Sequence, residues 1–302
     1  MQKLGMYLGC NIPFNAPDIE QSFRQALPTL GVEVVDLEGA TCCPAWGTAP
    51  SFDIDTWLAV SSRNISLAEQ HQVDIMTGCN SCFGILSEAK HMLDHQPERK
   101  SAVNAILEKI GRKYQGNSDV YHVAHVLHQK VGPDKIRASI KYTLKQLKIA
   151  VQPGCHLLWP SDMMKVTEDN PFYPQMLKEL CRALGAETPH YSRLDSCCGM
   201  GAMRSTDMEK SMATLKDKLC SMKEEIDPDM IVTTCSSCYM QFDSAQKVLR
   251  EKGEIDFAIP VFYYTQLMAL CLGCDPSQVA AISETPREQI INRIQSEQRI
   301  VQ

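Results

Sequence analysis

The first half of the chain alternates between short apolar runs and longer amphipathic stretches. The apolar runs predict strands over residues 3–10, 32–37 and 73–79. Apolar residues three and four positions apart predict helices over residues 18–31 and 54–71. Strands separated by helix-length segments are typical of βαβ units, so we expect an α/β fold built on parallel sheet.

The same order recurs in the second half. Apolar runs over residues 147–155 and 229–235 occupy the places of the first and third strands. The segment VYHVAHVLHQKVG (120–132) is echoed by VFYYTQLMALCLG (261–273), which we interpret as buried core, with a docking surface as the alternative. The polar run from Pro276 onward predicts a helix at the end of the chain.

Ten of the 14 cysteines form two matching sets, spaced C-x31-CC-x35-C-x-x-C and C-x41-CC-x36-C-x-x-C. The sets comprise Cys10, Cys42, Cys43, Cys79 and Cys82, then Cys155, Cys197, Cys198, Cys235 and Cys238. This recurrence indicates an internal duplication, with halves 1–145 and 146–302 that we expect to be related by a pseudo-twofold axis. Each group follows a predicted strand, and open α/β sheets build their sites beyond the carboxyl ends of strands.

Two adjacent cysteines disfavour a disulfide between them and favour a metal site. Consecutive Cα atoms lie about 3.8 Å apart, whereas an unstrained disulfide needs about 4.4–6.8 Å. A closed zinc site uses four ligands and leaves a fifth cysteine idle. An iron–sulfur cluster suits neighbouring thiolates better, either as an unusual cluster or as a cubane with a spare residue. A dithiol redox pair is the remaining alternative. The other cysteines are interpreted as packing residues (Cys181, Cys220) or as an isolated C-x-x-C (Cys271, Cys274).

The composition narrows the class of protein. A net charge of −6 without a long basic run disfavours nucleic-acid and polybasic-membrane roles. No apolar run of 18 residues and no signal-peptide pattern is present, so we expect a cytoplasmic protein without direct membrane insertion. Since neither G-x-G-x-x-G nor a P-loop appears, electrons are expected to come from another protein.

With MYLGCNIP, ATCCPAWG, SFDIDTWLAVSSRNI and MTGCNSCF, the whole chain resembles the family of heterodisulfide reductase B subunits. Its two arrays look like duplicated cysteine-rich CCG domains. The resemblance implies reduction of the mixed disulfide of coenzyme M and coenzyme B to two thiols. It also implies two non-cubane [4Fe-4S] clusters, one on each five-cysteine array. The first array departs from the pattern, reading CCP at Pro44 where the second reads CCG at Gly199.

The resemblance also implies partners. They are a ferredoxin-like C subunit and a flavin-bearing A subunit, which work with a hydrogenase or a formate dehydrogenase. The substrate is a small anionic disulfide, whose cleavage takes two electrons and two protons.

Two residues beside the arrays are candidates for handling that substrate. His156 follows Cys155 and can deliver protons near neutral pH, unless it is a loop histidine bonded to backbone. Arg204 follows the second cysteine pair and can hold a sulfonate or phosphate, unless it is solvated. Arg63 is a further candidate. We interpret three histidines of residues 120–132 as packing or surface residues, namely His122, His125 and His128.

Three alternatives stay open at this point. A related B subunit acts on a protein-bound disulfide or persulfide in sulfur metabolism. A CCG-domain subunit of a lactate, glycolate or quinone-linked oxidoreductase relays electrons without an open iron. A zinc-stabilised scaffold has no catalytic role.

Overall fold

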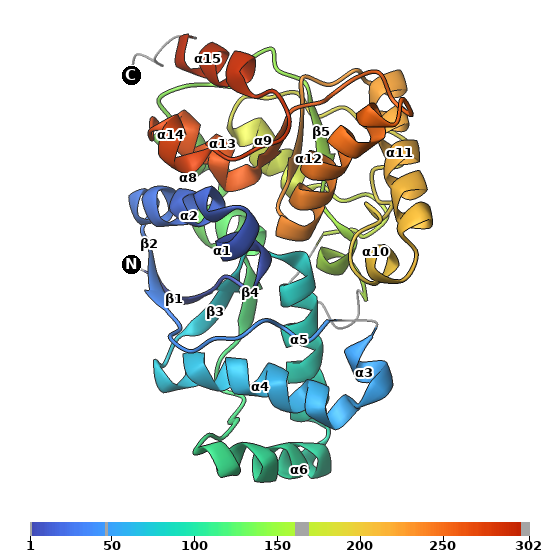
Figure 1. Cartoon of the computed structure of the whole chain (residues 1–302). Helices are drawn as coiled ribbons and strands as arrows, with labels where there is room; N and C mark the ends of the chain where they lie inside the picture. The colour runs from blue at the N-terminus through green and yellow to red at the C-terminus, as the bar shows by residue number, and fades with distance from the viewer. Residues whose placement is uncertain (1, 46–47, 161–168, 297–302) are drawn as a thin grey trace.

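The computed structural model describes residues 2–45, 48–160 and 169–296, and the chain forms two parallel sheets flanked by helices (Figure 1). A four-stranded sheet has the order β2-β1-β3-β4, and a three-stranded sheet has the order β5-β6-β7. The strands are β1 (Gln2–Tyr7), β2 (Val32–Asp36), β3 (Asp74–Thr77), β4 (Val120–His122), β5 (Ile149–Gln152), β6 (Met230–Thr233) and β7 (Val261–Tyr263). All pairings are parallel, which confirms the predicted α/β class with two duplicated halves. The pseudo-twofold axis stays a prediction.

Helices connect the strands and cover the sheets. In the first half they are α1 (Asn11–Asn15), α2 (Pro17–Thr29), α3 (Ala49–Phe52), α4 (Ile54–Gln70), α5 (Asn80–His95), α6 (Pro97–Leu107), the 3-10 turn η1 (Glu108–Ile110), α7 (Val123–His125), the π-helical η2 (Val126–Val131) and α8 (Pro133–Ser139). In the second half they are the 3-10 turn η3 (Cys155–Leu157), α9 (Met176–Ala183), α10 (Ala202–Thr206), α11 (Met208–Glu225), α12 (Ser236–Glu251), α13 (Tyr264–Leu272), α14 (Pro276–Val279) and α15 (Glu288–Ser296).

Among the described residues, the second sheet has no full counterpart of β2. At the corresponding place a single parallel bridge joins Lys148 and Glu187. Its hydrogen bonds run from the Glu187 N–H to the Leu147 carbonyl (2.9 Å) and from the Ile149 N–H to the Glu187 carbonyl (2.8 Å). Pro189 follows two residues later and has no N–H to continue the ladder. The duplication therefore keeps the strands before the single cysteines and the C-x-x-C motifs, and it reduces the edge strand before the second cysteine pair to one bridge.

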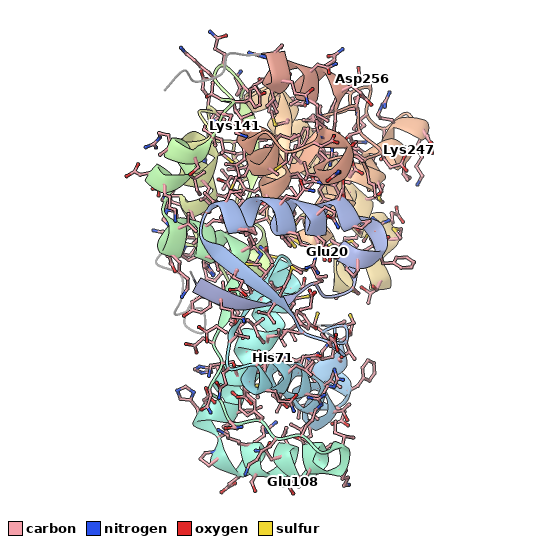
Figure 2. All side chains as sticks on the ribbon, turned by 90° about the vertical axis from the view of Figure 1, so that its left-hand side faces the viewer. Glu20, His71, Glu108, Lys141, Lys247 and Asp256 are labelled. Carbon is pink, nitrogen blue, oxygen red and sulfur yellow. The ribbon has the colours of Figure 1, made fainter. Side chains whose placement is uncertain are left out.

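The two halves are joined by α2, which packs against α13 and α14 of the second half (Figures 1 and 2). The Ser22 and Thr265 hydroxyl oxygens are 2.5 Å apart, and the Asp18 carboxylate accepts a hydrogen bond from the Ile282 N–H at 2.9 Å. Figure 2 shows Glu20, on α2, near the middle of the molecule, with Glu108 near one end and Asp256 near the other. The seam between the halves is thus continuous core.

Several interpretations of the sequence can be compared with the fold. Residues 261–272 are buried throughout, so they are core and the docking alternative is wrong. The C-terminal run forms two short helices, α14 and α15, in place of one, because residues 280–287 leave the helical path. Cys181 is buried in α9 as expected, whereas Cys220 is only half-buried. Among the described residues, no helix has the length and apolar character needed to cross a bilayer.

Candidate functional site

Cys10, Cys79, Cys155 and Cys235 lie two or three residues beyond strands, as the sequence predicted, whereas the strand expected before Cys197 is reduced to a single bridge. Cys79 and Cys235 hold extended backbone after β3 and β6 and form the N-caps of α5 and α12. Each C-x-x-C therefore spans a strand end and the first helical turn that follows it. Backbone N–H groups and the helix dipole favour negative charge at such a position, and of the four C-x-x-C thiols it is Cys79 whose pKa lies below its usual range.

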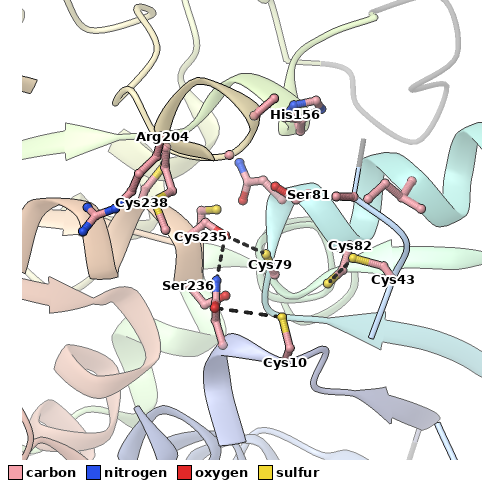
Figure 3. A pocket seen from close by; sticks show the side chains of 18 of the residues that line it. Cys10, Cys43, Cys79, Ser81, Cys82, His156, Arg204, Cys235, Ser236 and Cys238 are labelled. Atoms are coloured by element: carbon pink, nitrogen blue, oxygen red, sulfur yellow. Dashed lines mark hydrogen bonds between the residues drawn. The ribbon is translucent and has the colours of Figure 1, made fainter. Parts of the chain in front are cut away.

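The two arrays open into one cavity of about 650 Å³ between the halves (Figure 3). All ten cysteines line it: Cys10, Cys42, Cys43, Cys79, Cys82, Cys155, Cys197, Cys198, Cys235 and Cys238. Segments more than 100 residues apart in the sequence thus meet at a single point. No acidic side chain lies among the described residues of its lining.

Within each half the thiols are close enough to contact one another. The Cys43 and Cys82 sulfurs are 3.4 Å apart, and the Cys198 and Cys238 sulfurs are 3.2 Å apart. Figure 3 shows Cys79 and Cys235 facing each other across the seam. Contact with Cys235 is also the main reason why the pKa of the buried Cys79 thiol lies well below its usual range.

Neighbouring thiols within each array also stabilise a thiolate of a cysteine pair. Contact with Cys42, and next with Cys82, lowers the pKa of Cys43 to about 5. Contact with Cys155, and next with Cys198, lowers the pKa of Cys197 to about 2. Each cavity wall therefore presents a sulfur ready to act as an anionic ligand.

This donor set fits an iron–sulfur centre. The cavity lining contains ten thiols. Thiolates are soft ligands, which bind Cu(I), zinc or iron–sulfur clusters. Among the described residues, no three cysteine, histidine or acidic side chains converge on a point that suits a single metal ion. In the second half the Gly199 N–H points at the Cys197 sulfur at 3.3 Å, which is the kind of contact that surrounds cluster sulfurs.

His156 and Arg204 both line the cavity, as the sequence suggested, and their roles stay predictions. His156 lies against the backbone of Gly84 on α5, and burial lowers the pKa of its imidazole. Arg204 donates a hydrogen bond to the Gln241 side-chain oxygen, and Figure 3 shows it beside Cys238. Arg63 is not part of the described lining, since it donates to the Gly39 carbonyl in the loop before the first cysteine pair.

The residues that hold the loops of the cysteine pairs were missed from the sequence. Asn64 and Tyr7 bind the backbone of Thr41, next to Cys42. Lys218 binds the backbone of Ser196, next to Cys197. A signal for Lys218 was present, because it lies on the same face of α11 as Ser211, Leu215 and Met222, at core spacing.

The histidines of residues 120–132 do not share one helical face. His122 ends β4, its Nδ1 accepts a hydrogen bond from the Ala124 N–H, and burial lowers its pKa to about 4. His125 is buried beside it, and the ring of Phe83 lies edge-on to both imidazoles. His128 is further out and pairs with Glu179. The interpretation as packing and surface residues agrees with this burial.

The model of the CCG cysteine-rich domain family matches residues 4–87 and 149–243, once in each half. A protein of Archaeoglobus profundus that is named as like the B subunit of heterodisulfide reductase is 54% identical over 99% of this chain and 100% of its own length. The B subunit of the ferredoxin/F420H2-dependent CoB-CoM heterodisulfide reductase of Methanosarcina acetivorans is 40% identical, over 92% of each chain. The membrane anchor subunit of the 8-methylmenaquinol:fumarate reductase of Wolinella succinogenes is 31% identical, over 90% of this chain and 93% of its own.

A solved structure described as a hypothetical protein from Helicobacter pylori has the same fold, with a TM-score of 0.75 over 94% of this chain. The chain spans 52% of the length of that structure and is 12% identical to it, so the likeness concerns fold alone. The sequence relatives are much closer, and the family model matches both halves. With its two five-cysteine arrays in one cavity, this chain belongs to the CCG cysteine-rich domain family and, within it, to the B subunits of heterodisulfide reductases, which are oxidoreductases.

Proposed function

We propose that this chain is the catalytic subunit of a heterodisulfide reductase, which cleaves a small mixed disulfide of the coenzyme M–coenzyme B type to two thiols. The observation that carries the proposal is the joint opening of both cysteine arrays into one cavity. A disulfide that lies in this cavity has one array on each side of it. A chain of relay centres needs no such shared space, so the electron-transfer alternative is less favoured.

We propose two non-cubane [4Fe-4S] clusters as cofactors, held by the first array (Cys10, Cys42, Cys43, Cys79 and Cys82) and the second array (Cys155, Cys197, Cys198, Cys235 and Cys238). When bound, the clusters supply one electron each, so that R–S–S–R′ with two electrons and two protons yields R–SH and R′–SH. The chain itself supplies the space, the charge and the protons.

The side chains of the cavity suit a small anionic disulfide. Leu8, Ile85, Met200 and Met203 line it and offer apolar contacts to the body of such a substrate. Arg204 and His156 are the basic side chains of the described lining, and a charge-assisted contact to a sulfonate or phosphate is worth about 1.5–3 kcal/mol. We propose that Arg204 turns from Gln241 to the substrate anion, and that His156 returns a proton to a product thiolate.

We also propose that the chain works in the cytoplasm as one member of a complex, with a ferredoxin-like subunit as electron donor. Cys10 and Cys42 are exposed, which brings the first array to the surface of this chain. Phe14 and Phe52, which follow these two cysteines in the sequence, are 87% and 90% exposed. A flavoprotein subunit, with a hydrogenase or formate dehydrogenase, supplies the electrons further upstream.

The test is a reductase assay on anaerobically prepared, iron-loaded protein. About eight irons per chain, which two four-iron clusters require, and release of two thiols from the coenzyme M–coenzyme B disulfide support the proposal. Full iron loading with turnover only on a protein-bound disulfide favours the sulfur-metabolism alternative. Zinc in place of iron overturns the assignment of the cofactor.

A further inference from the structure

The loops that carry the two cysteine pairs are held from behind by different groups. In the first half Asn64 Oδ1 accepts a hydrogen bond from the Thr41 N–H at 3.0 Å, and the Tyr7 hydroxyl donates to the Thr41 carbonyl at 2.6 Å. Both side chains are fully buried, and neither carries a charge at neutral pH. The first pair is thus held by an amide and a phenol, and the half-buried Arg63 guanidinium donates to that amide oxygen at 3.2 Å.

In the second half a lysine takes this place. The Lys218 Nζ donates to the Leu194 carbonyl at 3.2 Å and to the carbonyl of Ser196, which precedes Cys197. Lys218 is 1% exposed, and its Nζ lies 5.8 Å from the ring centroid of the buried Tyr191. A buried ammonium therefore sits directly behind the second cysteine pair.

Asn64 and Lys218 occupy equivalent places. The helices α4 and α11 each follow a cysteine pair and begin after an aspartate N-cap, Asp53 and Asp207. Asn64 and Lys218 each lie 11 residues after that aspartate. This place therefore holds an uncharged amide in the first half, with the half-buried Arg63 guanidinium beside it, and a fully buried ammonium in the second half.

That charge is not cancelled by a buried acid. No carboxylate among the described residues forms an ion pair with Lys218, and Asp195, in the loop that Lys218 holds, is exposed. Burial lowers the pKa of Lys218 to about 8, so that it is still charged at neutral pH. Away from water, a charge acts on its neighbours far more strongly than at the surface.

A second difference between the halves also favours extra negative charge at the second cysteine pair. The Gly199 N–H donates to the Cys197 sulfur at 3.3 Å, whereas Pro44 has no N–H to offer at the matching place. Hydrogen bonds to cluster sulfurs and nearby positive charge both favour the reduced, more negative state.

We propose that Lys218 is a positioning residue that makes the centre on the second array a stronger electron acceptor than the centre on the first array. The inference rests on the proposed iron–sulfur cofactors. It orders the two centres: an electron delivered by an iron–sulfur protein at the exposed first array moves on to the second. The second centre is then reduced before the first.

A redox titration of the iron-loaded full chain, with dithionite as reductant and electron paramagnetic resonance as readout, tests this order. Signals are assigned with Cys42→Ser and Cys197→Ser variants. In the wild type, the signal of the second array is expected to be reduced first. Reduction of the first array's signal before the second overturns the proposal, whatever the variants do.

The Lys218→Gln variant isolates the charge, and Lys218→Arg keeps it. The neutral variant is expected to lower the one-electron equilibrium constant of the second centre about tenfold, or about 59 mV, and to leave the first centre unchanged. Lys218→Arg stays near the wild type. Asn64→Ser, the matched change behind the first pair, leaves the second centre unchanged.

Equal shifts in Lys218→Gln and Lys218→Arg, at full iron content, would mean that packing rather than charge is at work and overturn the inference. If the Lys218→Gln variant has the same potentials as the wild type, the inference is also overturned. Neither outcome touches the proposed function, because the titration requires clusters but no disulfide turnover. Thiol release in the reductase assay tests that function separately.

Discussion

The two halves hold the same five cysteines in different surroundings. In the first half Cys10 and Cys42 are exposed, whereas their counterparts Cys155 and Cys197 are half-buried. The first pair is followed by proline, which fixes φ near about −65°, and the second by Gly199 at φ +87°. The spacing of the cysteines has thus been kept while the polypeptide around each pair has diverged. The comparison teaches that one pattern of cysteines can stand in two electrostatic environments.

The largest effect is expected from removal of either cysteine pair. Cys42→Ser/Cys43→Ser and Cys197→Ser/Cys198→Ser are each expected to lose about half of the iron and to lower disulfide reduction at least about 100-fold. The reason is that both centres are needed for a two-electron cleavage. Iron analysis and thiol release measure this, with Cys220→Ser, outside the arrays, as the control. Turnover that survives the loss of one array would contradict the shared-cavity proposal.

Substitution by alanine is expected to destabilise the protein much more at Gly199, after the second cysteine pair, than at Pro44, after the first pair. An added Cβ at Gly199 lies 2.6 Å from the Ser211 carbonyl oxygen, in a backbone region that other residues rarely adopt. Gly199→Ala is therefore expected to cost about 2–5 kcal/mol of unfolding free energy. Pro44→Ala, the matched change in the first half, is expected to cost at most about 1 kcal/mol. Denaturant unfolding of the metal-free protein compares the two, and equal losses would show that the loops are under the same constraint.

The free energy of unfolding is expected to depend on pH through β4 but not through β7, because His122 on β4 occupies the place of Tyr263 on β7. Burial lowers the pKa of His122 to about 4 in the folded chain, below its ordinary value of 6.5 in an unfolded chain. Between these values the unfolded chain binds a proton that the folded chain does not, so stability falls as the pH falls. The loss between about pH 7 and pH 4 is about 3 kcal/mol.

The His122→Asn variant keeps an acceptor for the Ala124 N–H and removes this titration. Its unfolding free energy is expected to fall less over the same pH range than that of the wild type. Some dependence remains, because burial also lowers the pKa of His125. An unchanged slope in His122→Asn would assign the acid sensitivity elsewhere.

The smallest effect is expected at Tyr263, which ties the two halves together. Its hydroxyl lies 2.8 Å from the Gly78 carbonyl and 2.7 Å from the Thr234 carbonyl, each one residue before a cysteine. Tyr263→Phe is expected to cost about 1–2 kcal/mol, since the hydroxyl has two acceptors but one proton. Unfolding at neutral pH measures it, and Tyr7→Phe is the comparison within one half. A cost of zero would mean that Tyr263 stabilises the seam through the packing of its ring and not through its hydroxyl.

Much of the fold was predictable, because strand ends and cysteines coincide. The apolar runs before Cys79 and Cys235 became β3 and β6, and the parallel α/β class followed from the helix-length gaps. The missing β2 counterpart was not foreseen, although Pro189 was its signal. The C-terminal run was predicted as one helix because polarity alone does not mark where a helix breaks.

The functional surroundings were less predictable. Lys218 carries a polar side chain whose burial depends on the carbonyls of a loop more than 20 residues away. Arg204 was assigned to substrate from its place after the cysteine pair, but its partner Gln241 comes from a different helix. Neighbouring side chains of this kind are set by packing, which leaves only a faint trace in the spacing of residues.

By itself, the sequence determined the ten thiols, their division into two equal sets and the position of the single cysteines and the C-x-x-C motifs just after strands, because spacing and periodicity are local properties of a chain. Only the tertiary structure decided that the two sets share one cavity and that a lysine lies behind one of them. The shared cavity depends on how α2 and α13 bring distant segments together at the seam. The burial of Lys218 depends on backbone carbonyls that accept hydrogen bonds from its ammonium group.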